Sequence, residues 1–372
     1  MRFLVDSQVY DFQTYGGISR YYTEIFSNIK ENYPEDSIDF SLLATKNVYF
    51  NESNLINRKQ EFYKFIFQNA KRVKISLDSK IVIKNRENTI KKLKKGEFDV
   101  FIPTYYDPYF LEYLSGKPFV LSVYDMIHEL FPQYFENASF NERKRKKILI
   151  ERADKIIAVS HNTKKDILRI YPDTDASKIE VIYHSNSLEN AHDISSILPD
   201  NYILYVGNRL TYKNFGFFIK SIKSLLEKDR DIKILCAGGG NFSHEELSFF
   251  KDLNISDQIV HFNFNDNELS FFYKNAICFV FPSMYEGFGI PVLEAMSSSC
   301  PIVLGKHSSF KEVAGDAGVF FDINSQKDLL DKVSSLVYDK KLREKHIQLG
   351  LQQNSKFSWT SAAKQFREFS KR

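Results

Sequence analysis

The stretch SMYEGFGIPVLEAM occupies residues 283–296 and decides which fold the chain is expected to adopt. A short apolar run, 276–282, precedes it and ends in a proline, which is typical of a buried parallel strand. Pro291 suits the first turn of a helix, where its missing N–H leaves no hydrogen bond unmade. The stretch therefore predicts a strand, a glycine loop and a helix in that order.

Two carboxylates lie eight residues apart in this stretch. We expect Glu286 on the loop and Glu294 in the first turn of the helix. The loop glycines let backbone N–H groups approach a phosphate at the helix N-terminus. The carboxylates can then accept hydrogen bonds from hydroxyls on either side, an arrangement that fits a sugar, a diphosphate and a ribose in a row. The alternative for either glutamate alone is helix capping in an ordinary turn.

The whole stretch closely resembles the Glu-x7-Glu signature of retaining glycosyltransferases of family 4. The resemblance implies the GT-B fold, an α/β architecture of two doubly wound Rossmann-like domains that face each other across a cleft. It also implies that Glu286 contacts the hydroxyls of the donor sugar and Glu294 those of the ribose. The same resemblance assigns four further residues to donor binding, namely Gly287, Phe288, Gly289 and Ile290.

A second motif follows a predicted strand at Gly207, where Arg209 and Lys213 stand four residues apart. Both cations suit phosphate oxygens, and two surface cations on a loop are the alternative. The segment 207–214 resembles the family's Gly-x5-Lys-Asn pattern. This implies that Gly207 adjoins the donor and that both cations stabilise the departing diphosphate. Tyr212 stands where many family members carry an arginine, and Arg209 matches an alternative placement of that arginine.

Two further candidate positions lie in the first half of the chain. Gly16 and Gly17 open a predicted helix after the first strand, and glycines there let the backbone approach a ligand, although a plain turn is the alternative. The family resemblance implies that this pair faces the donor. Asp125 follows another buried strand at a family catalytic position. Tyr124 replaces the family's histidine, and His128 is either its substitute or a structural hydrogen-bonding residue.

Strands and helices alternate in both halves, which predicts two parallel sheets, each covered on both faces. In such sheets ligands bind at the carboxyl ends of the strands, and with two sheets facing each other we expect the site in the cleft between them. By the resemblance, the last helix returns to the first domain. The predicted parts are an acceptor-side domain 1–184, a linker 185–200, a nucleotide-sugar-binding domain 201–355 and a C-terminal helix 356–372.

The bulk composition excludes several classes of protein. The chain has 372 residues, 43% of them hydrophobic, which suffices for two cores. It lacks an apolar run of about eighteen residues, so no transmembrane helix is expected. Its three cysteines lie in apolar contexts, which suits a reducing cytoplasm, and no Cys/His spacing suggests a metal site. The resemblance implies no cofactor, with a UDP- or GDP-linked sugar as substrate.

The net charge of +4 arises in the first half of the chain. Residues 58–95 hold 13 basic and three acidic side chains, and residues 143–147 are all basic. One interpretation is a solvated helix face. The other is a surface for anionic lipid headgroups or a phosphorylated acceptor, which would place the protein peripherally on the inner face of a membrane. No nucleic-acid recognition motif accompanies these charges.

The combined prediction is a metal-independent retaining glycosyltransferase of the hexosyltransferase class. It would move a sugar from a nucleotide-diphosphate sugar to a hydroxyl of a glycan or lipid-linked glycan, in bacterial surface polysaccharide (O-antigen) synthesis. One alternative is a non-catalytic nucleotide-sugar-binding subunit, which would be free to lose the pairs Glu286/Glu294 and Arg209/Lys213. Another is a phosphorylase of the same fold, which needs pyridoxal phosphate, and no segment suggests the Schiff-base lysine.

Overall fold

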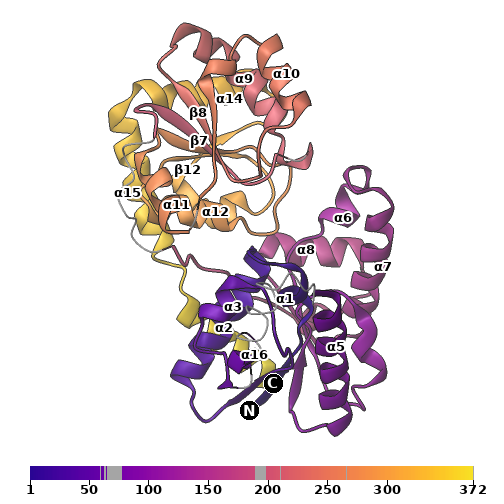
Figure 1. Cartoon of the computed structure of the whole chain (residues 1–372). Coiled ribbons are helices and arrows are strands. Elements are labelled where there is room, and N and C mark those ends of the chain that lie inside the picture. Colours follow the sequence, from indigo (N-terminus) through magenta and orange to yellow (C-terminus); the bar gives the residue numbers. More distant parts are fainter. Residues whose placement is uncertain are drawn as a thin grey trace. The chain divides into compact units, whose positions relative to one another are not determined.

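The computed structural model divides the chain into two compact units, drawn in Figure 1. The N-terminal unit comprises Met1–His184 together with Trp359–Arg372, and the C-terminal unit comprises Ser185–Ser358. The structure describes residues 1–58, 60–62, 64, 78–188, 198–209, 211–264 and 266–371. Much of the predicted linker, 189–197, lies outside the described residues.

The N-terminal unit is built on parallel strands. These strands are β1 (Arg2–Val5), β2 (Ser37–Phe40), β3 (Val100–Ile102), β4 (Val120–Val123), β5 (Lys155–Ala158) and β6 (Ile179–Val181). They form the ordered groups β2-β1-β3 and β4-β5-β6, which an isolated parallel bridge between Phe101 and Phe119 connects. Strands β1, β3, β4 and β5 are apolar and almost fully buried, as expected for strands covered on both faces.

Helices follow most strands of this unit, as the alternating pattern predicts. The helices are α1 (Gln8–Phe12), α2 (Gly17–Asn32), α3 (Val48–Glu52), α5 (Asp78–Lys95), α6 (Ile127–Leu130), α7 (Glu136–Arg152), α8 (His161–Ile170) and α16 (Trp359–Lys371). Short 3-10 turns are η1 (Pro108–Glu112), η2 (Pro132–Tyr134) and η3 (Ala176–Lys178). Ser160 caps α8 by accepting a hydrogen bond from the N–H of Thr163 at 3.0 Å.

The C-terminal helix α16 packs against α2 of the N-terminal unit, where Figure 1 shows it in yellow. Its apolar face is buried, and the ring of Phe366 contacts those of Phe3 and Phe26. Arg367 forms ion pairs with Glu35 and Asp36 and so fixes the end of the helix. Burial of this face explains why an amphipathic pattern appears at the end of the sequence.

The C-terminal unit contains one six-stranded parallel sheet in the order β12-β11-β10-β7-β8-β9. Its strands are β7 (Tyr202–Val206), β8 (Lys233–Ala237), β9 (Ile259–Phe262), β10 (Cys278–Phe281), β11 (Ile302–Gly305) and β12 (Gly318–Phe321). The chain first adds strands on one side of β7 and then returns to add β10 on its other side. The topological switch point of the sheet therefore lies between β7 and β10.

Helices on both faces enclose the core of this unit. They are α9 (Phe215–Lys228), α10 (His244–Asp252), α11 (Asp266–Asn275), α12 (Ile290–Ser297), α13 (Phe310–Ala314), α14 (Gln326–Tyr338) and α15 (Lys340–Asn354), with the turns η5 (Thr211–Lys213), η6 (Ser256–Gln258) and η7 (Gly315–Ala317). Apolar side chains of β7, β8, β10, α9 and α14 form a continuous cluster. This packing makes the sheet a rigid base for the loops at its carboxyl edge.

Two strands, β2 and β12, were not predicted. Both lie at the edge of a sheet, and both alternate between more and less buried residues. Such strands lack the continuous apolar run that marks the central strands. Among the helices that the structure describes, none combines the length and apolar character needed to cross a bilayer.

Candidate functional site

The loops after β7 and β10 leave the sheet on either side of the switch point. The first loop carries Lys213 in η5, and the second carries Glu286. A backbone hydrogen bond from the N–H of Met284 to the carbonyl of Tyr212 joins the two loops at 2.8 Å. Residues that stand about seventy positions apart in the sequence therefore meet at one edge of the sheet.

Lys213 and Glu286 form an ion pair across these loops. The Nζ of Lys213 lies 2.5 Å from Oε1 of Glu286, and each side chain is 17% exposed. The ammonium also lies 5.1 Å and 5.4 Å from the ring centres of Tyr212 and Phe281. A cation that is held by one carboxylate and two rings, and still reaches solvent, can exchange that carboxylate for an anionic ligand.

The glycine loop after Glu286 is fixed by hydroxyls from the segment that follows β11. Ser308 Oγ bonds both the N–H and the carbonyl of Glu286, at 3.0 and 2.5 Å. The buried Ser309 Oγ donates to the carbonyls of Glu286 and Phe288, each at 3.0 Å. Gly289 precedes α12 with φ of 94°, a conformation that favours glycine. The loop thus reaches the helix N-terminus in one defined path.

Glu294 lies one turn further into α12 than the sequence predicted. The helix begins at Ile290, so Glu294 is its fifth residue and not part of the first turn, because the glycine turn ends at Gly289. The carboxylate is nearly buried and accepts a hydrogen bond from the Tyr273 hydroxyl at 3.2 Å. Burial, together with the charge of Glu294, raises the pKa of Tyr273, so this phenol remains a donor.

His307 stands beside the same loops. Its Nε2 lies 3.0 Å from the carbonyl oxygen of Ser283, which can only accept, so Nε2 carries the proton. Burial lowers the pKa of His307, and the ring is therefore neutral at pH 7. His307 braces the start of the loop that carries Glu286.

Arg209 lies on the loop after β7, where its side chain is bonded within the C-terminal unit. Its guanidinium is bound by Glu246 of α10 and by carbonyl oxygens of the loop after β8, including that of Gly238. The predicted contact with a donor diphosphate would require these bonds to be replaced. Gly207, two residues earlier, has φ of 108° and closely approaches Gly239 of that loop.

In the N-terminal unit, Gly16 and Gly17 stand at the start of α2, as predicted. The side chain of Gln13 already occupies this helix end, where its Oε1 accepts from the N–H of Ser19 at 3.1 Å. A Cβ at Gly16 would meet that side chain at 2.3 Å. Arg20 is buried and lies 4.4 Å from the centre of the Tyr49 ring. A ligand phosphate at this helix end would have to displace Gln13.

Asp125 and His128 follow β4 and both lie near α7. The buried Lys146 bonds the Asp125 carbonyl at 3.1 Å and pairs with Glu129 at 3.0 Å. His128 Nε2 lies 3.8 Å from Glu142. These contacts correct part of the basic-surface prediction for residues 143–147, because Lys146 points inward and neutralises Glu129.

The basic segment 58–95 falls only partly within the described structure. Residues 59, 63 and 65–77 lie outside it. Helix α5 exposes Lys84, Lys91 and Lys95. Lys92 pairs with Asp39 at 2.5 Å, and Lys94 lies over the Tyr113 ring, so these two cations are partly engaged within the unit.

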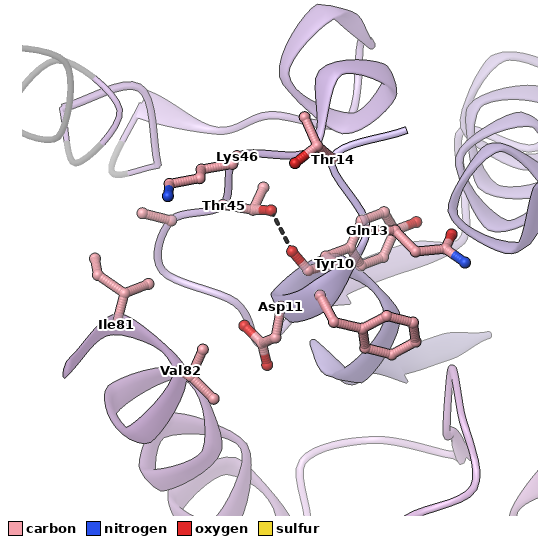
Figure 2. Close-up of a pocket in the computed structure, with 10 residues that line it drawn as sticks. Tyr10, Asp11, Gln13, Thr14, Thr45, Lys46, Ile81 and Val82 are labelled. Atoms are coloured by element: carbon pink, nitrogen blue, oxygen red, sulfur yellow. Dashed lines mark hydrogen bonds between the residues drawn. The ribbon is translucent and has the colours of Figure 1, made fainter. Parts of the chain in front are cut away.

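Two adjoining cavities, of about 200 and 470 Å³, open between α1 and α5 of the N-terminal unit. Asp11, Phe12 and Val82 line both, and we call them together the α1–α5 cavity. Figure 2 shows the smaller one, with Asp11 of α1 pointing toward Val82 of α5. The larger one also meets Tyr105 and Glu142, whose side chains are hydrogen-bonded at 3.2 Å.

The side chain of Asp11 has a raised pKa in this cavity. Burial raises its pKa to about 7, against hydrogen bonds from Asn85 and Ser7 that lower it. The neighbouring Asp6 is fully buried, and burial raises its pKa to about 6. A carboxyl group that titrates near neutrality can either donate or accept, and Phe12 offers an exposed ring beside it. This combination suits a ligand rich in hydroxyls.

Comparison with solved structures identifies the fold. The chain superposes on the HepE protein of Anabaena, solved in complex with UDP and glucose, with a TM-score of 0.70 and 13% identity over 99% of this chain and 98% of that one. Two family models match consecutive parts of the sequence. Glycosyltransferase Family 4 matches residues 58–188, and Glycosyl transferases group 1 matches residues 189–353. The chain has the GT-B fold, and consecutive parts of it match these two glycosyltransferase families.

Two named glycosyltransferases resemble this chain in sequence. The O-antigen chain mannosyltransferase RfbU of Salmonella typhimurium is 28% identical over 56% of this chain and 59% of its own length. The N-acetylgalactosamine-N,N'-diacetylbacillosaminyl-diphospho-undecaprenol 4-alpha-N-acetylgalactosaminyltransferase of Campylobacter jejuni is 27% identical over 53% of this chain and 54% of its own. The chain thus spans little more than half the length of these relatives.

Sequence reasoning missed several residues that hold the loops of this site. Ser308 and Ser309 hold the glycine loop, His307 braces it, and Glu246 binds Arg209. The local signal was the pair Ser308-Ser309, a few residues after the apolar run 302–304. In a parallel sheet that position is the ligand-binding edge.

The raised pKa of Asp11 predicts a pH dependence of stability. The folded state holds the Asp11 proton up to about pH 7, whereas the unfolded chain loses it near pH 4, so the free energy of unfolding falls as pH rises between these values. A shift of about three units corresponds to at most about 4 kcal/mol. Asp11→Asn should therefore lose less stability than the wild type between pH 5 and pH 8 in urea unfolding. An equal loss in both proteins would contradict the burial of this carboxyl.

Proposed function

We propose that this chain is a retaining glycosyltransferase that moves a sugar from a nucleotide-diphosphate sugar to a hydroxyl of a glycan or lipid-linked glycan in surface polysaccharide synthesis. The observation that carries the proposal is the Lys213–Glu286 ion pair between the loops at the β7–β10 switch point. The named O-antigen and diphospho-undecaprenol-dependent relatives support the substrate class, and the UDP and glucose of HepE support the donor class.

Donor binding would rearrange the ion pair. A diphosphate competes with Glu286 for the Lys213 ammonium, because both are anionic oxygen acceptors and the diphosphate carries more charge. Lys213 then stabilises the negative charge that grows on the departing diphosphate, an interaction stronger in the transition state than in the ground state. Glu286 becomes available to hydroxyls of the sugar. Glu294, held by Tyr273, accepts from the ribose.

The reaction breaks the bond between the sugar C1 and the diphosphate oxygen and forms one between C1 and the acceptor oxygen. We propose attack from the same face that the leaving group departs, so the anomeric configuration is retained. The acceptor proton passes to the departing diphosphate. Lys213 and the N–H groups at the start of α12 carry the leaving-group charge in this scheme, so no divalent metal is required.

The acceptor is proposed to bind the N-terminal unit at the α1–α5 cavity. Residues that follow β1 and β3 line this cavity. In the order β2-β1-β3 the chain adds β2 on one side of β1 and β3 on the other, so the switch point of this sheet lies between β1 and β3. The ring of Phe12 can stack on a sugar face, while Asp11 and Glu142 provide acceptors for hydroxyls. Arg145 adds a cation at the same cavity, which suits a phosphate-linked glycan.

A membrane surface is the proposed location of the lipid-linked acceptor. Helix α5 exposes Ile83 next to Lys84, and α7 exposes Phe140 near Lys144 and Lys147. Apolar side chains beside lysines suit the interface of an anionic bilayer. The inward-facing Lys146 takes no part in this surface.

Lys213→Ala should lower kcat at least a hundredfold, equivalent to about 3 kcal/mol of leaving-group stabilisation. Lys213→Arg should recover only part of the loss, because a planar fork replaces a compact ammonium. Glu286→Ala should also lower turnover strongly. Release of nucleoside diphosphate from candidate sugar donors measures these effects, and chelator should leave the wild type active.

The control for this prediction is Lys223→Ala, which breaks the exposed Lys223–Glu227 ion pair of α9. It should leave kcat unchanged. Full activity of Lys213→Ala would refute the site assignment, and binding of a donor without any turnover would favour a non-catalytic binding subunit. Dependence on added divalent metal would refute the metal-free scheme, and an inverted anomeric configuration of the product would refute retention.

Neutralising the exposed lysines of α5 should weaken membrane binding. The triple variant Lys84→Gln, Lys91→Gln and Lys95→Gln should sediment less with anionic liposomes, and wild-type binding should weaken as salt rises, because ions screen these charges.

The matched control for the liposome experiment removes the same charge from the C-terminal unit, at the exposed Lys340, Lys341 and Lys345. This control should bind liposomes as the wild type does. Equal loss of binding in both triple variants would show that net charge, and not this surface, determines binding. Equal sedimentation of the wild type with neutral and anionic liposomes would exclude the proposed surface.

A further inference from the structure

Arg209 is the most heavily bonded cation in the described part of the C-terminal unit that the proposed mechanism does not use. Its side chain is 4% exposed. Nε and Nη2 bond the two carboxylate oxygens of Glu246, at 2.6 and 3.3 Å. Nη1 donates to the carbonyl of Gly238 at 3.1 Å, and Nη2 to those of Gly240 and Asn241, at 2.9 and 3.2 Å. The ring centre of Phe242 lies 4.8 Å from the guanidinium carbon.

These bonds lock three segments together. Arg209 belongs to the loop after β7, its carbonyl partners belong to the loop after β8, and Glu246 lies in the first turn of α10. The Glu246 carboxylate also accepts from the N–H of Ser243 at 2.8 Å, as half of a capping box. One guanidinium–carboxylate pair therefore joins a helix start to two neighbouring loops at the ligand-binding edge.

The two loops that Arg209 connects are in backbone contact. A Cβ at Gly239 would lie 2.5 Å from the carbonyl oxygen of Gly207, so only glycine allows this approach. All three residues of 238–240 have φ near +75°, which is costly for other residues. A loop in such a conformation persists only when its surroundings hold it, and Arg209 does so by donating to the carbonyls of Gly238 and Gly240.

Turning Arg209 toward a ligand would be costly. It would leave the Glu246 carboxylate without its cation and release three carbonyl oxygens together. Breaking a largely buried pair by removing one partner is strongly unfavourable, because the other charge remains buried. Lys213 pairs with Glu286, and its side chain is 17% exposed against 4% for Arg209, so Lys213 is the cation better placed to exchange partners.

We propose that Arg209 is a positioning residue and not a ligand of the diphosphate. Held in place by Glu246, Arg209 fixes the loop 238–240 against Gly207 as one wall of the donor pocket, and Lys213 alone of these two cations binds the diphosphate. The proposal rests on the proposed donor function of the C-terminal unit. It differs from a direct role in one respect: Glu246 is then as necessary for nucleotide binding as Arg209.

The test uses calorimetry to measure how tightly UDP and GDP bind. The proteins compared are the wild-type chain, Glu246→Gln, Arg209→Gln and the double variant. Glutamine at 246 can still complete the capping box, so α10 keeps its start. If Arg209 holds the loop only while Glu246 orients it, each single variant should weaken binding of the preferred nucleotide roughly tenfold, and the double variant should be no weaker than either.

A direct phosphate contact predicts the opposite sign for Glu246. Freed from its carboxylate, Arg209 would bind the diphosphate as well as before or more tightly, so unchanged or tighter binding by Glu246→Gln overturns the proposal. Glu246→Asp keeps the charge but withdraws it by one methylene, and its binding should fall between wild type and Glu246→Gln. This variant decides the question if Glu246→Gln does not fold.

Glu245→Gln is the matched control, because Glu245 lies on the same turn and accepts a hydrogen bond from the Ser243 hydroxyl at 2.7 Å. It should bind nucleotide as the wild type does. Gly239→Ala should reproduce the loss of Arg209→Gln, since it separates the loops without changing a charge. A wild-type chain that binds neither UDP nor GDP would instead refute the proposed donor function itself.

Discussion

The switch in strand order between β7 and β10 is the constraint on which the site depends. Parallel hydrogen bonding brings all strand ends of the C-terminal unit to one edge, and the switch sends the loops after β7 and β10 to opposite sides of their shared boundary. Neither loop can satisfy its polar groups within the sheet. Lys213 and Glu286 pair across that boundary, so a cation and a carboxylate stand ready where a ligand can replace one of them.

Irregular loops at this edge are made rigid by side chains that come from neighbouring loops. Ser308 and Ser309 satisfy the carbonyls of the glycine loop after β10, and Arg209 does the same for the loop after β8. The side chains of Ser309 and Arg209 are buried, and the low dielectric around them strengthens these hydrogen bonds. The same principle appears in the N-terminal unit, where Lys146 holds the carbonyl of Asp125.

The sequence predicted those features that local patterns encode. Apolar runs, glycine turns and Pro291 located the central strands and the loop that carries Glu286, and family resemblance supplied the GT-B fold. Edge strands such as β2 were not predicted, because their exposed positions carry polar residues that interrupt the apolar run. Hydrogen-bonding and ion-pair partners that lie far apart in the sequence were not predicted either. No local pattern links Arg209 to Glu246, which lies 37 residues away. Lys146 stands in a basic run that suggests a surface, yet its side chain is buried and pairs with Glu129.

The most direct test of this account is a crystal structure of the chain with its preferred nucleoside diphosphate. We expect the diphosphate within hydrogen-bonding distance of the Lys213 Nζ and of N–H groups at the start of α12, with Glu286 released from Lys213 and the ribose at Glu294. Arg209 should remain on Glu246. A nucleotide bound away from the β7 and β10 loops, with the Lys213–Glu286 pair intact, would contradict the account.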